Sequence, residues 1–492
     1  MLIMKKSRLF PACMASLLWC SLPLMAQKQT AALKQAAISD LQAQYHHYKQ
    51  TALQLCQYAE VGYQEYKSAA LLAQTLRNSG FSVDTGVAGI PTAFVATYGS
   101  GKPVIGILAE YDALPGLSQE AVPEKKPRAG ATAGHACGHH LFGTASVAAG
   151  IALKKLIAAG QLKGTVKVYG CPAEEGGSGK VYMVRAGLFD DVDAVLHWHP
   201  GDHNGVTLGR SMANISAKFR FQGLSAHAAA APEKGRSALD GVEAMNHMVN
   251  LLREHIPSST RIHYVITNGG KAPNVVPDFA EVYYYVRNRD RDIVRSVFER
   301  VVNAARGAAL GTGTTMTYEI TGGVYDMLPN RTLALAMHKN LQQVGGVPYT
   351  PEETAFGEKI QSTFAYTPPP ISRAATVDTL QAERPGDGGG STDVADVSWT
   401  VPTIGLSAAT WVPGTPAHSW QAVAAGGTDI GAKGMMVAAK TIALTGIDLF
   451  RDPALVQKAT AEFIKAKGPG FRYRALLGDR EPALNYRDQG TE

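Results

Sequence analysis

Residues 133–150 read AGHACGHHLFGTASVAAG, a loop of His, Cys and Gly that runs directly into an apolar helix of small residues. In the loop, Cys137 and His139 stand two residues apart, and Gly138 between them lets the backbone turn tightly. A thiolate and an imidazole at this spacing favour two ligands on one metal cluster. The competing interpretation is a buried cysteine beside histidines, because the paired C-x2-C spacing of structural zinc sites is missing.

A buried strand is predicted just before this loop. Residues 104–110 form a near-continuous apolar run, which is typical of a strand covered on both faces. The run ends at Glu110 and is followed by Asp112. Acidic residues at the carboxyl end of such a strand lie where open α/β sheets bind their ligands, although a solvated turn would show the same residues.

A second predicted strand, residues 164–170, leads into the adjacent carboxylates Glu174 and Glu175 and two glycines. Neighbouring loop residues can serve different tasks, so one carboxylate can hold a metal while the other takes a proton from water. A solvated acidic turn is the alternative.

A third predicted strand, residues 193–200, ends with His197 and His199. Strand alternation places the two imidazoles on one face. Either histidine could bind metal, and either could be a core histidine with its hydrogen bonds satisfied.

From about residue 211 the pattern changes. Strands are expected at 217–221, 261–268 and 280–288, and helices at 238–255 and 294–310. This order suggests a small α+β layer inserted into the larger domain. Within it, His227 lies in a turn of small residues that leaves its imidazole accessible.

Four other segments are assigned more coarsely. Residues 30–80 are predicted to form a pair of packing helices, and residues 81–98 a β-rich run. The Pro- and Gly-rich residues 346–392 are expected to form an ordered long loop or a lid. The charged tail beyond Arg451 gives no prediction.

Residues 1–26 have the pattern of a cleaved signal peptide, with Lys5, Lys6 and Arg8 before an apolar stretch. The apolar stretch is too short, and too interrupted by prolines, to favour a membrane span. We therefore expect export to a bacterial periplasm and no stable membrane insertion after cleavage.

Net charge and cysteine count limit the possible classes of function and the state of the thiols. The formal charge of +6 falls by three once the expected signal peptide is removed, which gives no argument for nucleic-acid binding. Three cysteines remain, Cys56, Cys137 and Cys171, and an odd number cannot all pair internally. At least one thiol is therefore free, intermolecular or metal-bound.

Four motifs together carry a resemblance that covers nearly the whole mature chain: LAEYDALP at 108–115, HACGH at 135–139, PAEEGG at 172–177 and PAHSW at 416–420. With them the chain resembles the aminoacylase and carboxypeptidase superfamily of co-catalytic metal hydrolases. It is most similar to the amidohydrolase branch, and within that branch to the p-aminobenzoyl-glutamate hydrolases.

The resemblance implies an α/β catalytic domain, residues 27–210 and 328–492, with a mostly parallel central sheet flanked by helices. A smaller α+β dimerisation domain at 211–327 would interrupt it, and the protein would be a homodimer. The resemblance also implies two divalent cations, Mn²⁺ or Zn²⁺, held by Cys137, His139, Glu175, His199 and His418. It gives Glu174 the role of general base.

Other roles follow from the same resemblance. His227 would reach into the neighbouring subunit's site, and Asn274 and Arg287 would bind the substrate's carboxylate end. Asp112 would orient a ligand. Glu110 stands where carboxypeptidase relatives carry a metal-binding histidine, and we do not count it as a ligand.

The choice of His199 over His197 also rests on the resemblance. The family's ligand lies six residues after an aspartate that starts a strand, and Asp193 and His199 keep that interval.

The expected activity is hydrolysis of an amide between an acyl or aroyl group and an amino acid or short peptide, with a p-aminobenzoyl-glutamate-like small molecule as the favoured substrate. A dipeptidase or an N-acyl amino acid deacylase of the same family is the alternative. Two alternatives come from other classes: a non-catalytic periplasmic binding protein, and a thiol hydrolase that uses Cys137 with His139 or His418.

Overall fold

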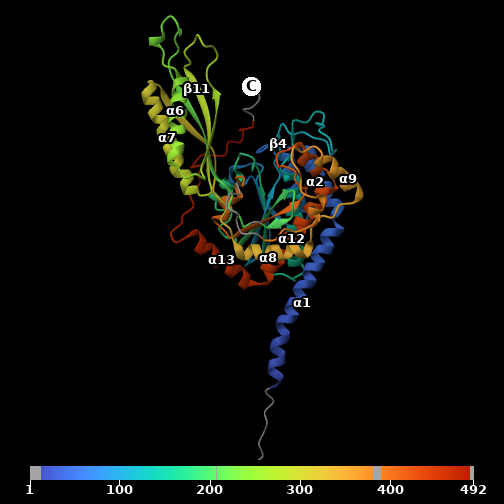
Figure 1. Cartoon of the computed structure of the whole chain (residues 1–492). Coiled ribbons are helices and arrows are strands. Elements are labelled where there is room, and N and C mark those ends of the chain that lie inside the picture. The colour runs from blue at the N-terminus through green and yellow to red at the C-terminus, as the bar shows by residue number, and fades with distance from the viewer. Residues whose placement is uncertain (1–12, 207, 381–388, 488–492) are drawn as a thin grey trace, which may run out of the picture.

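The computed structural model describes residues 13–206, 208–380 and 389–487 (Figure 1). The basic residues of the expected signal peptide lie outside these ranges, and residues 13–26 belong to helix α1 (Cys13–Ala43). The chain forms a larger α/β unit and a smaller α+β unit that rises beside it. This confirms the predicted fold class.

A seven-stranded sheet forms the centre of the larger unit, in the order β1-β2-β6-β3-β7-β13-β8. Strands β6, β3, β7 and β13 run parallel, and antiparallel strands lie at both edges. Every residue of β3 is buried, as its apolar run predicts. The strands are β1 (Ser82–Thr85), β2 (Phe94–Ser100), β3 (Val104–Glu110), β6 (Gly164–Cys171), β7 (Ala194–Gly201), β8 (Gly205–Val206) and β13 (Thr403–Ala409), and a separate small ladder joins β4 (Leu114–Pro115) to β5 (Ala133–Gly134).

Helices cover both faces of the large sheet, with α4, α8 and α12 on one face and α5 and α10 on the other. Their bounds are α2 (Tyr45–Tyr58), α3 (Tyr66–Asn78), α4 (His139–Ala158), α5 (Gly179–Arg185), α8 (Arg331–Val344), α9 (Pro351–Gln361), α10 (Val394–Ser398), α11 (Trp420–Gly426), α12 (Asp429–Arg451) and α13 (Pro453–Lys467). Short 3-10 turns span η1 (Val87–Gly89), η2 (Pro232–Lys234), η3 (Arg253–His255) and η4 (Ile371–Ala375).

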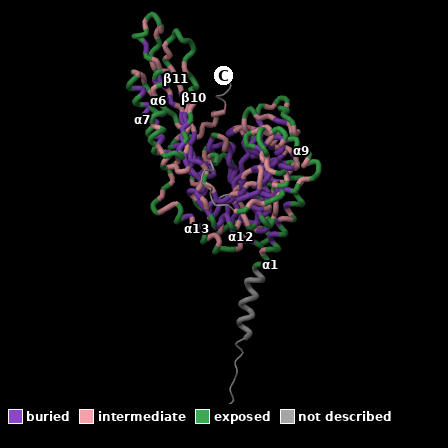
Figure 2. Tube along the Cα trace, in the orientation of Figure 1, coloured by how far each residue is buried: buried purple, intermediate pink, exposed green. Residues whose placement is uncertain are grey.

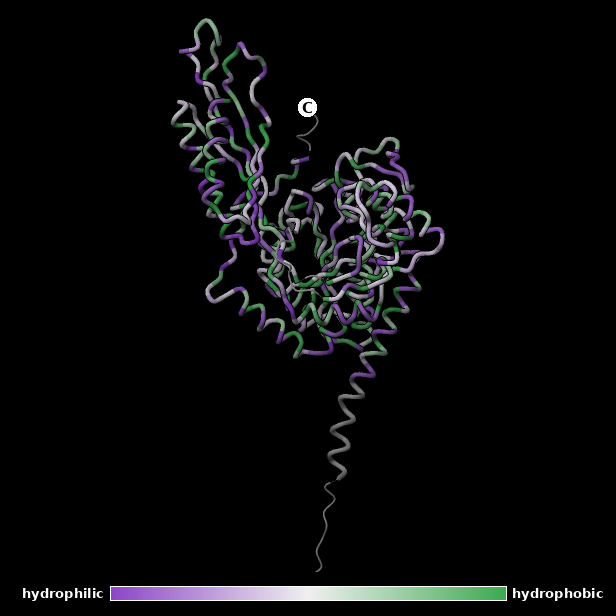
Figure 3. Tube along the Cα trace, in the orientation of Figure 1, coloured by the Kyte–Doolittle hydropathy of each residue, from purple (hydrophilic) through white to green (hydrophobic). Residues whose placement is uncertain are grey.

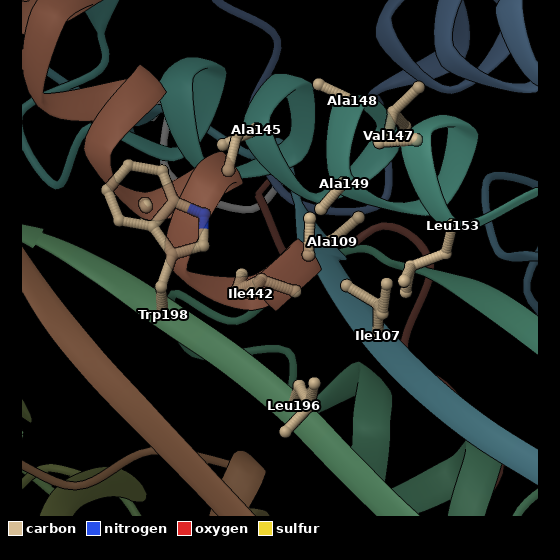
Figure 4. Packing of buried hydrophobic residues seen from close by; sticks show 14 of the residues in the cluster. Ile107, Ala109, Ala145, Val147, Ala148, Ala149, Leu153, Leu196, Trp198 and Ile442 are labelled. Atoms are coloured by element: carbon tan, nitrogen blue, oxygen red, sulfur yellow. The ribbon is translucent and has the colours of Figure 1, made fainter. Parts of the chain in front are cut away.

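Small side chains let α4 approach the sheet closely. Figure 4 shows Ala149 of α4 and Ile442 of α12 in the same apolar cluster as Ala109 of β3. A Cβ atom at Gly143 would lie 2.6 Å from the carbonyl oxygen of Glu110, so the contact requires glycine. The first turn of α4 is thereby held against the carboxyl end of β3.

The smaller unit is an antiparallel sheet in the order β10-β11-β9-β12, with one face covered by two helices. Along β11 buried residues alternate with partly exposed ones, and Tyr283, Tyr285 and Arg287 lie on the face away from the helices. The elements are β9 (Ala213–Gln222), α6 (Ala238–Leu252), β10 (Arg261–Asn268), β11 (Phe279–Asn288), α7 (Arg291–Thr312) and β12 (Thr315–Val324). We refer to residues 213–324 as the lid unit.

The prediction of two helices over residues 30–80 is wrong, because the structure has three. Helices α1 and α2 are separated at the single residue Gln44, whose backbone dihedrals (φ −94°, ψ 9°) leave the helical range. Neither Gly nor Pro marks that break, so the sequence does not reveal it.

Two other segments are more regular than predicted. Residues 81–98 contain two antiparallel strands, and Gly86 and Gly89 take positive φ angles in the connection between them. The segment 346–392 contains helix α9, which begins with a capping box formed by Thr350 and Glu353. The glycines of the first segment and the Thr350–Glu353 capping pattern of the second are both visible in the sequence.

Burial is concentrated around the large sheet, and exposed residues collect at the far end of the lid unit (Figure 2). Figure 3 shows hydrophobic segments in both units, and the far end of the lid unit carries the exposed apolar residues Leu224, Val265, Ile266 and Val275. Helices α4 and α12 are long and apolar enough to span a membrane, but 78% and 89% of their apolar windows are buried. That burial is typical of the core helices of a globular fold.

Candidate active site

The candidate site lies at the carboxyl ends of β3, β6 and β7, where the first turn of α4 meets the sheet. Cys137 and His139 come from the loop before α4 and from its first residue, and Glu175 comes from the loop after β6. His199 is near the end of β7, and His418 follows β13. Parallel strands bring these distant segments to one edge of the sheet.

The five predicted metal ligands form two groups that share Cys137. The ligand atoms of Cys137, His139 and His199 lie within 4.8 Å of one another, and so do those of Cys137, Glu175 and His418. The Cys137 Sγ atom is 3.3 Å from His199 Nε2, and His418 Nε2 is 3.1 Å from Glu175 Oε1. Two adjoining sets of thiolate, imidazole and carboxylate donors are suited to two divalent cations.

Three buried polar atoms at this point form no hydrogen bond: His139 Nε2, Glu110 Oε2 and Glu175 Oε1. His139 Nε2 and Glu110 Oε2 lie 3.1 Å apart, and Glu175 Oε1 lies 3.1 Å from His418 Nε2. Because buried polar atoms in folded proteins are nearly always hydrogen-bonded, these close but unbonded pairs call for a further group. A divalent cation fits that requirement.

Asp112 orients the candidate ligand His139. Its Oδ1 atom accepts from His139 Nδ1 at 2.9 Å, and its Oδ2 atom accepts from the backbone N–H of Glu175, also at 2.9 Å. Burial opposes ionisation of Asp112, but the His139 imidazole outweighs it and holds the pKa of Asp112 below its ordinary value. Hydrogen bonding at Nδ1 leaves Nε2 free for a metal, as in other carboxylate–histidine pairs.

The adjacent carboxylates Glu174 and Glu175 have opposite electrostatic environments. Burial, with Glu110 and Glu175 adding like charge, raises the pKa of Glu174 well above its ordinary value. For Glu175 burial also opposes ionisation, but the His418 and His139 imidazoles together outweigh it and lower the pKa. Environments that separate two carboxyl pKa values in this way are typical of a proton carrier beside a charged ligand.

A buried ion network that the sequence did not reveal lies beside Glu174. The Lys180 ammonium is 2.6 Å from Glu110 Oε1 and 2.7 Å from Asp393 Oδ1, and all three side chains are buried. Burial alone would lower the pKa of Lys180, but Asp393 and Glu110 raise it well above its ordinary value. Glu110 also lies 3.1 Å from His139 Nε2, so the network reaches the candidate metal position.

His197 occupies a different environment from His199. Its ring packs over Gly405 of β13, where an added Cβ atom would approach within 2.3 Å. Burial lowers the pKa of His197 to about 3. Within the described residues, His197 belongs to none of the groups that could hold a metal, which favours His199.

His227 and Asn274 lie together at the far end of the lid unit. The N–H of Ala228 donates to the carbonyl of Asn274 at 3.0 Å, and both predicted functional residues are exposed. These turns adjoin the end of β11 at Phe279. Arg287 stands eight residues further along the same strand, a distance of roughly 27 Å at about 3.4 Å per residue. Arg287 therefore lies near the larger unit, whereas His227 and Asn274 do not.

All three cysteines of the expected mature chain are free thiols. Replacing Cys137 with alanine should lower bound metal and turnover together, because the residue belongs to both ligand groups. Metal analysis of the purified variant measures the effect. Cys56→Ala, in helix α2, is the matched control and should keep wild-type metal content. Full metal content in Cys137→Ala would contradict the assignment.

Comparisons with known proteins agree with this geometry. A model of Peptidase family M20/M25/M40 matches residues 106–420. The chain is 42% identical over 450 residues to one of the subunits of the p-aminobenzoyl-glutamate hydrolase of Escherichia coli strain K12, covering 86% of this chain and 93% of that protein. It is 31% identical over 387 residues to the Xaa-Arg dipeptidase of Mus musculus, covering 76% and 78%. A dinuclear metal-binding peptidase of the M20 family from Bacillus subtilis has a similar fold, with a TM-score of 0.58 and 18% identity over 83% of this chain and 99% of that one.

Proposed function

Because the chain belongs to Peptidase family M20/M25/M40, a family of metal-dependent hydrolases, we propose that it cleaves the amide bond between an acyl or aroyl group and an amino acid or short peptide. The observation that carries the proposal is the pair of ligand groups sharing Cys137. A proton-carrying carboxylate, Glu174, lies directly beside them.

In the proposed mechanism, two divalent cations would be held by Cys137, His139, Glu175, His199 and His418. Such a pair would supply Lewis acidity for the substrate carbonyl and would lower the pKa of water. Glu174 takes the proton of the attacking water and passes it to the leaving amine nitrogen. Asp112 keeps His139 in the tautomer and orientation that ligation needs.

The favoured substrate is a small aroyl amide of the p-aminobenzoyl-glutamate type. Support comes from the Escherichia coli relative, whose name gives that substrate and whose length is almost entirely matched. The dipeptidase relative supports the alternative of a dipeptide or an N-acyl amino acid. Mn²⁺ and Zn²⁺ both suit the mixed thiolate, imidazole and carboxylate donors.

A panel of amides, assayed with defined metals, tests the proposed function. Chelation should abolish hydrolysis and either Mn²⁺ or Zn²⁺ should restore it, with p-aminobenzoyl-glutamate cleaved faster than dipeptides or N-acetyl amino acids. Full activity after exhaustive chelation would instead favour a thiol hydrolase, and binding without turnover under every metal condition would favour a binding protein.

We also propose that the protein works as a homodimer in a bacterial periplasm. The separation of His227 from its own subunit's ligand groups supports completion of each site by a neighbouring copy. The name of the Escherichia coli relative, a hydrolase subunit, also supports assembly with another chain. Export is supported by residues 1–26 alone. N-terminal sequencing of the exported protein tests it, since an intact Met1 would contradict cleavage.

A further inference from the structure

Residues 468–487 follow helix α13 and contain no helix or strand, yet they connect the two units. In Figure 1 this segment, coloured red, leaves α13 and climbs between the lid unit and the large sheet. We call it the strap. Its course brings a distant part of the sequence to the candidate active site.

The first half of the strap is fixed at the base of the lid unit. Phe471 packs on the indole of Trp399 at 4.9 Å between ring centroids. The Tyr473 hydroxyl donates to Asp396 at 2.6 Å, and the Tyr325 hydroxyl donates to the backbone carbonyl of Arg474, also at 2.6 Å. Phe471 and Tyr473 also pack against the apolar core of the lid unit, so contacts with both units determine where this half lies.

The middle of the strap connects strand β12 to helix α5. Arg480 donates to the carbonyl of Ile320 and lies 3.3 Å from Glu319. On the other side, Arg185 donates to the carbonyl of Arg480 at 2.6 Å. The lid unit and helix α5 of the larger unit therefore hold this region of the strap together.

The last described residues of the strap reach the loop that carries the adjacent carboxylates. The Tyr486 hydroxyl donates to the backbone carbonyl of Glu175 at 2.9 Å, and Arg487 Nη2 donates to the same oxygen. Tyr486 also packs edge-on against Tyr63. A cavity of about 370 Å³, lined partly by Gly176 and Tyr283, adjoins this point.

Two guanidinium groups lie next to residues around this cavity, which Tyr283 and Tyr486 both line. Arg487 lies over the Tyr486 ring at 4.8 Å. Arg287 lies over the ring of Tyr285 at 5.0 Å, and the Tyr285 hydroxyl accepts from Tyr283 at 3.3 Å. Arg487 and Arg287 both lie near Tyr285, where their positive charges partly offset the rise in its phenol pKa caused by burial. The Nε atoms of both arginines are buried and have no hydrogen-bond partner. A guanidinium is donor-only, so each buried Nε–H lacks an acceptor. Carboxylates are the acceptors whose geometry suits this group best.

The strap arginine differs from the other cations nearby. Arg220 and Arg480 form ion pairs with Glu319, and Lys218 lies 3.7 Å from Glu281. Their charges are thus balanced within the protein, whereas Arg487 forms no ion pair with an acidic side chain among the described residues. Its charge remains available for an anion.

We propose that Arg487 of the strap and Arg287 of the lid unit together bind the two carboxylates of an acidic amino-acid leaving group. The assignment rests on the proposed amide hydrolysis. It makes the strap a specificity element: Arg287 holds one carboxylate, and Arg487 adds selection for substrates that carry a second. Arg487 is a substrate-binding residue in this assignment, and its bond to the Glu175 carbonyl fixes its position.

The test compares N-aroyl-glutamate with the matching N-aroyl-glutamine, which lacks the side-chain carboxylate. Arg487→Ala should raise KM for the glutamate amide about ten- to a hundredfold, the scale of a lost charged hydrogen bond, and change KM for the glutamine amide by less than threefold. Bound metal and kcat should stay at wild-type values. Arg472→Ala, an exposed arginine of the same strap, is the matched control and should change neither KM.

Equal effects of Arg487→Ala on both amides, or a loss of bound metal, would overturn the assignment and leave the residue as a support for the Glu175 loop. Calorimetric binding of both amides to the Glu174→Gln variant, with and without Arg487→Ala, gives the same comparison without turnover. If the wild-type protein cleaved neither amide, the proposed function would fail, and the binding comparison would still decide the role of Arg487.

Discussion

Replacing Glu174 with glutamine is expected to lower kcat by roughly 10²- to 10⁴-fold, the usual scale for lost acid–base catalysis, while bound metal and substrate affinity stay near wild type. Glutamine keeps the size of the side chain but cannot carry the proton. The environment of Glu174 supports this role, because burial raises its pKa and so makes its carboxylate a stronger acceptor for the proton of water. Single-turnover kinetics together with metal analysis measure both parts of the prediction.

Glu175→Gln is the matched control because it makes the same chemical change one residue away. His418 lowers the pKa of Glu175 and lies 3.1 Å from its carboxylate, as expected of a charged ligand. This variant should lose metal first and activity as a consequence. If metal content fell in Glu174→Gln and survived in Glu175→Gln, the two roles would be exchanged.

His227→Ala is expected to lower kcat by about 10²- to 10³-fold, the usual cost of removing one donor to a developing oxyanion. The residue is exposed at the far end of the lid unit and contacts none of the candidate ligands in its own described chain. A donor that acts in the neighbouring subunit explains how such a position can affect turnover. His247→Ala, an exposed histidine on α6, is the control and should remain active.

Mixing His227→Ala with Glu174→Gln tests this action between subunits. Each variant is nearly inactive alone, but a mixed dimer contains one site with both wild-type groups. Activity should therefore return in part once subunits exchange. Absence of recovery, when exchange is proven by differently tagged subunits, would place His227 outside the neighbouring site.

The sequence could indicate which residues gather at the candidate site because their positions follow from strand order. Glu110 ends a buried strand, Glu174 follows one and His199 lies near the end of a third, and parallel strands bring such ends to one edge. Short motifs at strand ends therefore predict which residues, far apart in the sequence, lie close together in the fold. The same logic predicted the α/β class, since alternation of strands and helices is itself a sequence pattern.

Features that depend on tertiary contacts could not be predicted in this way. Lys180 follows three glycines and a serine in a polar stretch, and its complete burial depends on two carboxylates that are distant in sequence. The strap has no hydrophobic periodicity, so nothing local indicates that Tyr486 reaches Glu175. The break at Gln44 likewise has no breaker residue.

Because of the buried Lys180 network, binding of the proposed cations would also stabilise the folded protein. Glu110 and Asp393 both lie against one ammonium group, so the folded chain confines more negative than positive charge there. Cations that bind only the folded form shift the unfolding equilibrium, by about 4 kcal/mol at a thousandfold excess over Kd. Scarcity of metal would therefore reduce the number of surviving molecules as well as their activity.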